Sequence, residues 1–342
     1  MEKINIFDLN LNEFQSRLKR LKIESYVATQ VFEWIYKKRC LKLSKFTNIS
    51  KKNRQVLDEK FSFSCLKLVK IIRGEKNRAI KMLLQTEDNK SLEAVILDEK
   101  KYYTLCVSSQ CGCPLGCKFC LTGVVGLKRQ LKSNEIIEQV IQAEQQGFSI
   151  KNIVFMGMGE PLLNYKAVMT SIDTLCDKNL FGMSKRGITV STAGYLPGIQ
   201  KLMTENRALN IALSVGSVDP LKRKQLMPIE SRFSLNKVSK ILWTYLKDHN
   251  RKLTLEYTIL KDVNHSELEL KLLSNLAKYL NAKVNLINLN PHPKIPFEPV
   301  SINFLKLCQQ KIKNENVAVT IRYEKGQEIT AACGQLGESL LS

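Results

Sequence analysis

The segment that decides the fold reads Cys113-Pro114-Leu115-Gly116-Cys117-Lys118-Phe119-Cys120, which places three cysteines at the spacing C-x3-C-x2-C. Three thiolates from one short loop can bind three irons of a [4Fe–4S] cluster and leave the fourth iron open to a small chelating ligand. A structural zinc ion needs a fourth protein ligand, which Cys111 or Cys106 could supply. Zinc loops usually come as two separated C-x2-C halves, and the chain has no second half. The spacing therefore favours the cluster and leaves zinc as the alternative.

The cysteines and the first residues of the chain also bear on its compartment. Five of the ten cysteines lie within residues 106–120, which is unlike a structural disulfide set and fits a reducing environment. The start, Met1 to Asp8, lacks the apolar stretch of a secretory signal, and no window approaches 18 uninterrupted apolar residues. We expect a cytoplasmic protein that makes no contact with a membrane.

The charge of the chain indicates a polyanionic partner. The 342 residues hold 53 Lys and Arg against 32 Asp and Glu, a net charge of +21, and 44% of residues are hydrophobic, enough for a substantial core. A lysine-rich codon bias would produce the same excess. Charge alone is therefore a weak indicator of nucleic-acid binding.

The hydrophobic pattern changes character along the chain. Residues 11–60 show helical spacing, as in Leu11, Phe14, Leu18 and Leu21, and predict a small basic helical domain. Residues 61–98 contain three strand-like runs and predict a β-rich connection. From residue 99 onward, strands alternate with helices, which predicts an α/β fold with a parallel sheet closed or partly closed into a barrel. The predicted strands are 103–108, 153–156, 187–192, 210–215, 253–260, 284–289 and 317–322, and the predicted helices are 133–147, 164–178, 234–248, 266–280 and 302–314.

Several motifs in a fixed order resemble the radical-SAM rRNA adenine methyltransferases of the RlmN and Cfr family. The resemblance begins at Leu105-Cys106-Val107-Ser108-Ser109-Gln110-Cys111-Gly112-Cys113 and covers nearly the whole chain, because Phe32-Glu33-Trp34-Ile35-Tyr36 resembles the family's accessory RNA-binding domain. The other matching motifs are Gly157-Met158-Gly159-Glu160-Pro161-Leu162-Leu163-Asn164, Ser191-Thr192-Ala193-Gly194, Leu226-Met227-Pro228-Ile229, Asn290-Pro291 and Ala332-Cys333-Gly334-Gln335-Leu336.

The resemblance implies a partial (β/α) radical-SAM barrel with a small helical N-terminal accessory domain. It implies one [4Fe–4S] cluster and two molecules of S-adenosyl-L-methionine per turnover. The expected partners are 23S rRNA, tRNA and a flavodoxin- or ferredoxin-like reductant, and we expect a monomer. The expected division is an accessory domain at 1–60, a connection at 61–98, a barrel at 99–328 and a C-terminal segment at 329–342.

The resemblance also implies a two-stage reaction. The target, carbon 2 or carbon 8 of adenine, lies in an electron-poor ring and is not a nucleophile, so a protein thiolate first takes the methyl group from the cofactor. A radical made from a second cofactor molecule then abstracts hydrogen from that S-methyl group. The carbon radical adds to the base, and a second thiolate releases the product and leaves a disulfide.

By this resemblance Cys333 carries the methyl group, Cys106 is the resolving thiol and Glu93 is the base that removes the adenine proton. Without the motif, each cysteine would be read as a small buried residue and Glu93 as a surface residue. Cys113, Cys117 and Cys120 are the expected cluster ligands. The expected cofactor-binding residues are Gly159, Glu160, Ser191, Ser214, Val215, Gly216 and Asn290.

Two positions depart from a simple match. The family usually has His or Asn where this chain has Gly216, so we expect only a backbone contact there. We assign no chemical role to Cys111, which matches the sequence motif of Cfr. The run Gly159-Glu160-Pro161-Leu162-Leu163-Asn164 instead matches the sequence motif of RlmN. The sequence favours the carbon 2 enzyme, which acts on 23S rRNA and on the adenosine 3′ of the tRNA anticodon. The alternatives are a Cfr-like carbon 8 methyltransferase and a basic RNA-binding protein with a structural zinc.

Overall fold

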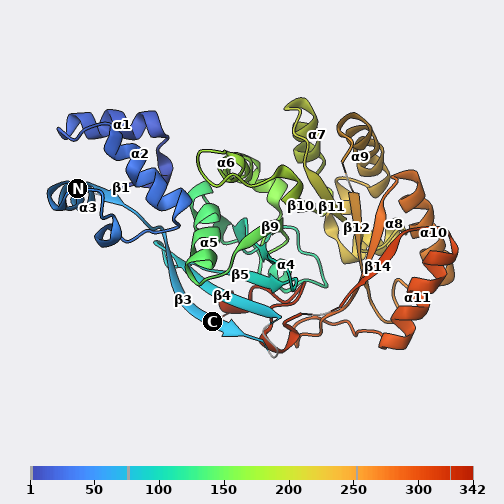
Figure 1. Cartoon of the computed structure of the whole chain (residues 1–342). Helices are drawn as coiled ribbons and strands as arrows, with labels where there is room; N and C mark the ends of the chain where they lie inside the picture. Colours follow the sequence, from blue (N-terminus) through green and yellow to red (C-terminus); the bar gives the residue numbers. More distant parts are fainter. Residues whose placement is uncertain (1–2, 75–77, 252, 324, 342) are drawn as a thin grey trace.

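A ten-stranded sheet forms the centre of the computed structural model, which describes residues 3–74, 78–251, 253–323 and 325–341 (Figure 1). Residues 1, 2 and 342, at the ends of the predicted domains, lie outside this set. The strands, in the order in which they lie across the sheet, are β14 (Val319–Arg322), β13 (Lys283–Asn288), β12 (Leu253–Ile259), β11 (Asn210–Ser214), β10 (Ile188–Thr192), β9 (Ile150–Phe155), β6 (Tyr103–Cys106), β5 (Ser91–Asp98), β4 (Ala79–Thr86) and β3 (Leu66–Arg73).

Within the ten-stranded sheet, the neighbouring strands among β6 and β9 to β14 pair in parallel, and helices connect most of them. This confirms the predicted α/β barrel fold. The α7 and α8 helices were not predicted because each is short, although both carry a proline in the first turn, where its missing N–H costs nothing. The helices are α5 (Ser133–Gln145), α6 (Tyr165–Cys176), α7 (Leu196–Thr204), α8 (Pro220–Leu226), α9 (Leu235–His249), α10 (Glu267–Tyr279) and α11 (Ile302–Asn314).

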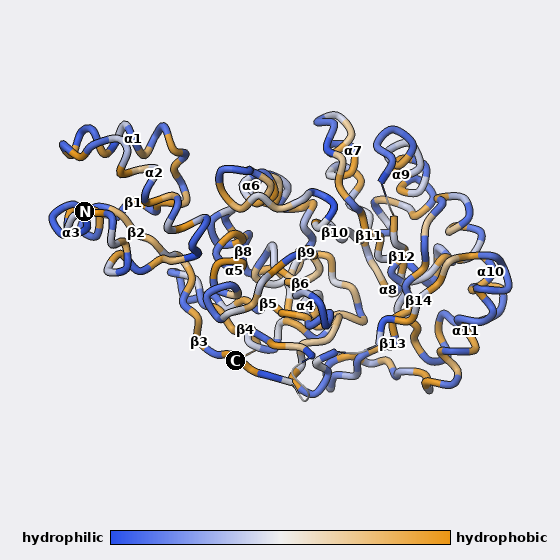
Figure 2. The backbone as a smooth tube through the Cα atoms, in the orientation of Figure 1, coloured by the Kyte–Doolittle hydropathy of each residue, from blue (hydrophilic) through white to orange (hydrophobic). Residues whose placement is uncertain are grey.

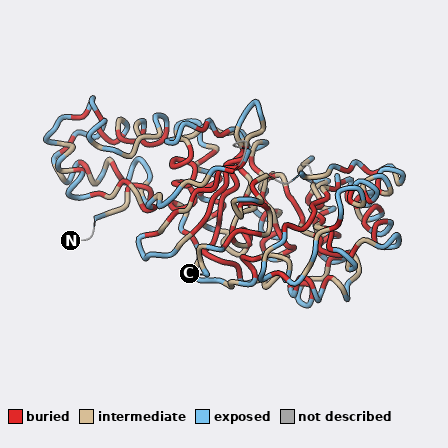
Figure 3. The backbone as a smooth tube through the Cα atoms, turned by 90° about the horizontal axis from the view of Figure 1, so that it is seen from below, coloured by how far each residue is buried: buried red, intermediate tan, exposed pale blue. Residues whose placement is uncertain are grey.

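The register brings the chemistry-bearing residues to one edge of the sheet. Cys106 pairs with Val154, and Ser214 pairs with Glu256. The carboxyl ends of parallel strands meet at the same edge, so the loops that follow β6, β9, β10 and β11 converge there. Seen from below, the strands are largely buried and the connecting turns exposed (Figure 3).

Strands β3, β4 and β5 continue the barrel sheet as an antiparallel extension. We predicted these runs as a connection; the structure pairs β5 with β6, placing Val95 opposite Cys106. Apolar residues alternate or run along these strands, as the hydropathy colouring shows (Figure 2). The extension therefore joins the same hydrophobic core as the barrel.

The N-terminal residues form a separate helical layer at one end of the molecule (Figure 1). An Asn10–Glu13 capping box starts the first helix, and Phe14 lies at the centre of an aromatic core. This core also packs on Ile137 and Ile141 of α5, which fixes the layer to the barrel. Its elements are β1 (Ile4–Asn5), α1 (Leu11–Arg20), α2 (Tyr26–Phe32), a π-helical turn at Glu33–Lys37, α3 (Lys51–Lys60) and β2 (Phe61–Ser62).

Short elements surround the three-cysteine loop. The antiparallel pair β7 (Gln110–Cys111) and β8 (Arg129–Gln130) precedes and follows it, and α4 (Leu121–Val125) begins directly after Cys120. Across the described ranges, none of the helices has both the length and the apolar character needed to span a membrane.

Candidate active site

The three cysteines of the loop line one cavity. Cys113 follows β7, Cys117 lies in the turn made by Gly116 at a positive φ of 66°, and Cys120 precedes α4. Burial raises the pKa of Cys113 to about 12 and that of Cys117 well above its ordinary value, and the neighbouring thiols raise both further. Three neighbouring thiols that oppose one another's ionisation stay protonated when free, and bound iron would offset the cost of ionising them.

The donor set fits an iron–sulfur cluster. The main-chain amides of Leu115 and Glu160 favour the Cys113 thiolate, and those of Thr122 and Gly123 favour the Cys120 thiolate. Within the described ranges, no three His, Cys, Asp or Glu side chains converge to hold a single metal ion. A cluster does not require such convergence, because each thiolate binds a different iron.

The predicted cofactor loops line the same cavity as the cluster cysteines. Gly159, Glu160, Ser191, Ser214 and Gly216 all contribute to its wall. Gly159 has a φ of 104°, and a Cβ there would lie 2.6 Å from the side chain of Gln110. The loop therefore requires glycine, and its bare backbone is free to approach a ligand.

Glu160 is one of the ionisable groups of this cavity besides the cysteines, together with Glu256 and Arg322. Its carboxylate accepts hydrogen bonds from the main-chain amides of Ala193 at 2.8 Å and Leu162 at 3.2 Å, which fix its orientation. Burial raises its pKa to about 7, while these amides act in the opposite direction. An ammonium group bound beside Glu160 would stabilise the ionised form.

Two predicted cofactor positions lie away from this wall. Val215 is fully buried, and its carbonyl accepts a 2.8 Å hydrogen bond from the Arg223 guanidinium, so its role in the fold is structural. Asn290 lines the neighbouring cavity instead. Its buried Oδ1 atom has no hydrogen-bond partner in the described part of the chain, which leaves an acceptor for a ligand hydroxyl or amine.

Gly216, where the chain departs from the family pattern, has a φ of 69°. A Cβ there would approach Met227 Sδ to 2.5 Å, so a side chain at this position would displace the methionine. Cys111 is buried in β7 and lines neither cavity, which agrees with the lack of an assigned role.

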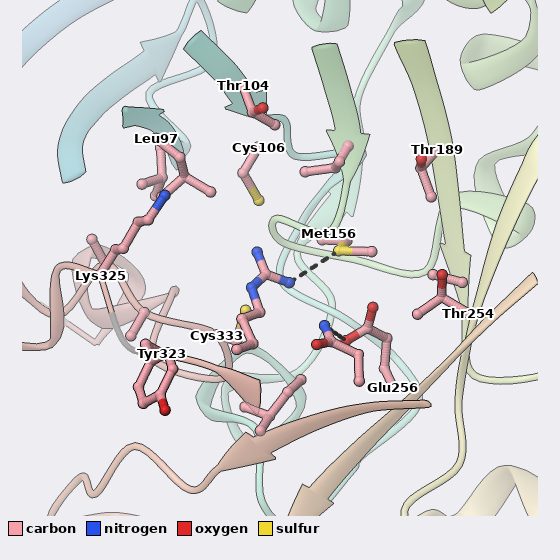
Figure 4. A pocket seen from close by; sticks show the side chains of 18 of the residues that line it. Leu97, Thr104, Cys106, Met156, Thr189, Thr254, Glu256, Tyr323, Lys325 and Cys333 are labelled. Atoms are coloured by element: carbon pink, nitrogen blue, oxygen red, sulfur yellow. Dashed lines mark hydrogen bonds between the residues drawn. The ribbon is translucent and has the colours of Figure 1, made fainter. Parts of the chain in front are cut away.

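Cys106 and Cys333 share a second cavity of about 540 Å³ (Figure 4). Cys106 ends β6 and is 6% exposed, whereas Cys333 is half-buried and lines both this cavity and the one with the cluster cysteines. Burial raises the pKa of Cys106 to about 12, and the Cys333 thiol raises it further. The structure thus brings together two thiols separated by more than two hundred residues of sequence.

Hydrogen bonds hold the Cys333 loop against the barrel. The Asn290 side chain donates to the Cys333 carbonyl at 3.0 Å, and the amide of Leu121, next to cluster residue Cys120, donates to the Gly334 carbonyl at 2.7 Å. The Gln335 side chain donates to the Pro291 carbonyl at 3.1 Å. The methyl-acceptor candidate is therefore tied to both the cluster loop and the strand β13 terminus.

Glu93 lies outside both cavities. It is 1% exposed, and its carboxylate accepts the main-chain amides of Gly337 at 3.4 Å and Ser339 at 3.1 Å. Lys81, 4% exposed, lies 3.9 Å from the same carboxylate and donates to Thr330 Oγ1 at 2.7 Å. In this conformation, Glu93 and Lys81 anchor the segment that carries Cys333.

Sequence reasoning missed Arg322 and Glu256. Arg322 ends β14 and Glu256 lies in β12, and both side chains line the two cavities. The only sequence signal for either was a charged residue inside an otherwise apolar strand pattern.

Comparison with known proteins agrees with the fold and the site. The family model described as the radical SAM superfamily matches residues 107–272, and the one described as the ribosomal RNA large subunit methyltransferase N-terminal domain matches residues 4–62. A probable dual-specificity RNA methyltransferase RlmN from Aquifex aeolicus is 38% identical over 337 residues, covering 97% of this chain and 96% of the relative. A protein of the same name from Endomicrobium trichonymphae is 38% identical over 338 residues, with 97% of each chain covered.

A solved structure is similar over almost the whole length. The crystal structure of a radical SAM methyltransferase from Sphaerobacter thermophilus has a TM-score of 0.93 and 33% sequence identity, covering 98% of this chain and 99% of that one. The similarity extends through the N-terminal layer as well as the barrel.

Proposed function

Because the chain belongs to the RlmN family of radical-SAM RNA methyltransferases, which use a [4Fe–4S] cluster and S-adenosylmethionine, we propose that it methylates carbon 2 of adenine through a methyl-cysteine intermediate. The proposed substrates are an adenine in the peptidyl-transferase region of 23S rRNA and the adenosine 3′ of the anticodon in tRNA. The observation that carries the proposal is the shared cavity of Cys106 and Cys333, which adjoins the cavity of the three loop cysteines.

The proposal assigns the residues of the first cavity to the cofactors. Cys113, Cys117 and Cys120 would bind the cluster, and the Gly159–Glu160 loop with Ser191 and Ser214 would bind S-adenosylmethionine. A cluster held by these cysteines would supply one electron for the reductive cleavage of S-adenosylmethionine into methionine and a carbon radical. Glu160 would orient S-adenosylmethionine by binding the amino group of this cofactor. The Asn290 Oδ1 atom, which has no hydrogen-bond partner in the described part of the chain, would accept a hydrogen bond from the cofactor.

Cys333 would accept the methyl group because its side chain borders both cavities. Once the S-methyl carbon is joined to adenine, Cys106 would attack the Cys333 sulfur. A sulfur–sulfur bond forms, the Cys333 sulfur–carbon bond breaks, and its electron pair stays with the carbon, which takes a proton to become the new methyl group. The two sulfurs are oxidised to a disulfide, so each turnover needs an external reductant.

Glu93 would accept the proton from adenine carbon 2, and the unpaired electron left by the radical addition would return to the cluster, so that the ring regains its aromatic form before Cys106 attacks. For this role the carboxylate has to be released by Gly337 and Ser339, so RNA binding would shift the C-terminal segment. The Glu93 carboxylate would then anchor the C-terminal segment before RNA binds and act as a base once RNA is bound.

The basic N-terminal layer would dock the RNA. Lys38 lies over the Trp34 ring at 3.7 Å, and Lys37, Lys42 and Lys45 are exposed nearby in the chain. Lysine side chains that contact phosphates displace the counterions condensed on the nucleic acid, and this release favours binding. The proposal also includes a flavodoxin- or ferredoxin-like reductant for the cluster, a monomeric state and a cytoplasmic location.

Thiol variants test the mechanism. Cys106→Ala protein should methylate Cys333 and then remain covalently joined to RNA, giving a nuclease-sensitive band shift on a denaturing gel. Cys333→Ala protein should carry no methyl group and form no adduct, and Cys176→Ala, altered at the end of α6, should turn over normally. Normal turnover by Cys106→Ala protein without an adduct would refute the mechanism.

The position of methylation needs a separate measurement. Mass spectrometry of RNA from cells lacking the protein, and of the same RNA after treatment with it, should show 2-methyladenosine appearing only with the protein. The appearance of 8-methyladenosine instead would assign the Cfr type of activity.

A further inference from the structure

The guanidinium of Arg322 is a cation with unused hydrogen-bond donors at the meeting point of the two cavities. Its one hydrogen bond to the described residues runs from Nη1 to Met156 Sδ at 3.5 Å, drawn as a dashed line in Figure 4. Among the described residues no carboxylate oxygen lies within 4.0 Å of it. A guanidinium has five N–H donors, so most of those of Arg322 have no hydrogen-bond partner among the described residues.

The ionisable groups that act on Arg322 are the thiols of Cys333 and Cys106 and the carboxylates of Glu256 and Glu99, with Cys333 the strongest. Figure 4 shows Cys106, Met156, Glu256 and Cys333 directed toward one space. Met156 links the cation to Cys106, because its sulfur accepts from Arg322 and its main-chain amide favours the Cys106 thiolate. Glu256 lines the same space, but its carboxylate already accepts a 2.9 Å hydrogen bond from Asn285. The unused donors of Arg322 are therefore available to a thiolate.

We propose that Arg322 is a positioning residue that stabilises the Cys106 thiolate for the resolving attack on Cys333. The inference rests on the proposed function, because the attack occurs only if an adduct forms on Cys333. It adds a residue that borders both cavities and, in this role, acts through Cys106.

The chemistry of resolution explains why a cation is needed at this position. The thiolate, not the thiol, attacks the sulfur, and burial of Cys106 opposes its ionisation. Arg322 acts against this effect, while the Cys333 thiol adds to it. A fixed positive charge beside Cys106 thus raises the small fraction of thiolate present at neutral pH.

The test follows Cys106 directly in the cluster-loaded enzyme. Iodoacetamide labels the protein, and mass spectrometry of the Cys106 peptide gives its alkylation rate. We expect Arg322→Met to lower this rate about ten-fold, the effect of raising a thiol pKa by about one unit. Arg322→Lys should stay within about three-fold of wild type, since it keeps the charge.

Two further variants test the direction of the charge effect on Cys106 alkylation and its specificity for Arg322. Glu256→Gln keeps an acceptor for Asn285 but removes the negative charge that competes for Arg322, so Cys106 should react faster. Lys325→Met removes another cation of the same cavity, one already paired with Glu99 at 2.9 Å, and should change the rate little. In single-turnover reactions, Arg322→Met should also slow the decay of the RNA adduct.

An unchanged Cys106 alkylation rate in Arg322→Met, with the visible absorbance of the cluster retained, would overturn the proposal. So would a loss confined to cofactor affinity, which would assign Arg322 to the cofactor. An equal loss in Arg322→Lys would also overturn it, because charge would not be the cause. Failure of Cys106→Ala to trap any adduct would instead count against the proposed function, and the alkylation result would still decide the role of Arg322.

Discussion

The side-chain amide of Asn290 donates a 3.0 Å hydrogen bond to the main-chain carbonyl of Cys333, although the two residues belong to different loops. The other polar atom of the same side chain, Oδ1, is buried without a partner in the described part of the chain. One asparagine thus holds the Cys333 loop with its donor and leaves its acceptor unused. In the proposed function, this division of roles would separate loop anchoring from cofactor binding.

The first prediction uses that separation. Asn290→Asp removes the donor and keeps an acceptor, so methyl transfer to Cys333 should slow about ten-fold, the cost of removing one hydrogen bond of roughly 1–1.5 kcal/mol. S-adenosylmethionine affinity should change much less, as measured by equilibrium binding. Asn314→Asp on the surface of α11 is the control. A large loss of affinity with normal methyl transfer would contradict the division of roles.

The second prediction concerns the Glu93 anchor. Glu93→Ala leaves two main-chain amides without their acceptor, which costs about 1–3 kcal/mol for each amide that stays buried. Hydrogen exchange of the peptide covering residues 331–341 should therefore speed up, and the unfolding temperature should fall. Glu87→Ala, in an exposed turn of the same antiparallel extension, should change neither. Unchanged exchange in Glu93→Ala would show that other contacts hold the segment.

The sequence predicted the barrel and most of the wall of the cavity around the loop cysteines because both follow local patterns. Alternating strands and helices dictate a parallel sheet, and residues at or just after the carboxyl ends of successive strands, such as Gly159, Ser191 and Ser214, must meet at one edge. Residues 61–98 show the limit of this reasoning. Three strands in sequence predict a sheet, but only tertiary pairing reveals that Val95 lies opposite Cys106 and extends the barrel.

The unpredicted parts of the site depend on contacts across long stretches of sequence. Arg322 and Cys106 are far apart in the chain, and only the curvature of the sheet brings β14 toward β6. Lys81 similarly reaches Thr330, and Glu93 reaches Ser339, through packing of the C-terminal segment. A motif match predicts a function for Glu93 but contains no information about which residues its carboxylate contacts in this structure.

The third prediction treats the loop cysteines as one unit. Replacing any one of Cys113, Cys117 and Cys120 with Ala leaves one iron without a protein ligand, so each variant should lose iron, sulfide, brown colour and turnover. Cys308→Ala, a buried cysteine of α11, should keep all four properties. Full iron and sulfide content in any of the three loop variants would contradict the assignment of these ligands.

The fourth prediction tests RNA docking by the N-terminal layer. Deleting residues 1–90 would also remove β3 and β4 and expose Ile137 and Ile141 to solvent. Substitutions of surface lysines remove charge without disturbing the fold in this way. The triple variant of Lys38, Lys42 and Lys45 to Ala should lower the salt dependence of RNA binding by about 0.7–0.9 in log–log slope for each phosphate that the protein no longer neutralises.

The control for RNA docking is a triple Ala variant on exposed barrel helices, at Lys237, Lys240 and Lys271. It removes the same charge from another face and should retain both affinity and salt slope. Equal weakening by the two triple variants would indicate a diffuse charge effect with no docking surface in the N-terminal layer.

The fifth prediction is the pH dependence of resolution. The pKa of Cys106 is raised to about 12 by burial and by the Cys333 thiol, and lowered in part by Arg322 and by the main-chain amide of Met156. Glu256 faces Arg322 from β12 and competes for its charge. Below the pKa of a thiol, the thiolate fraction rises ten-fold per pH unit, so the RNA adduct should decay about ten-fold faster for each unit between pH 7 and 9.

Quenched single-turnover reactions followed on denaturing gels would measure this decay. In Cys106→Ala protein the adduct should persist at every pH, because no thiolate attacks it from this position. In Arg322→Met protein, the decay rate of the RNA adduct should rise with pH at the same slope, but the whole curve should shift to higher pH. This is because only the pKa of the attacking thiol has changed. A decay rate independent of pH in the wild-type enzyme would mean that Cys106 is already ionised, or that another step limits resolution, and would contradict a buried neutral thiol as the resting state.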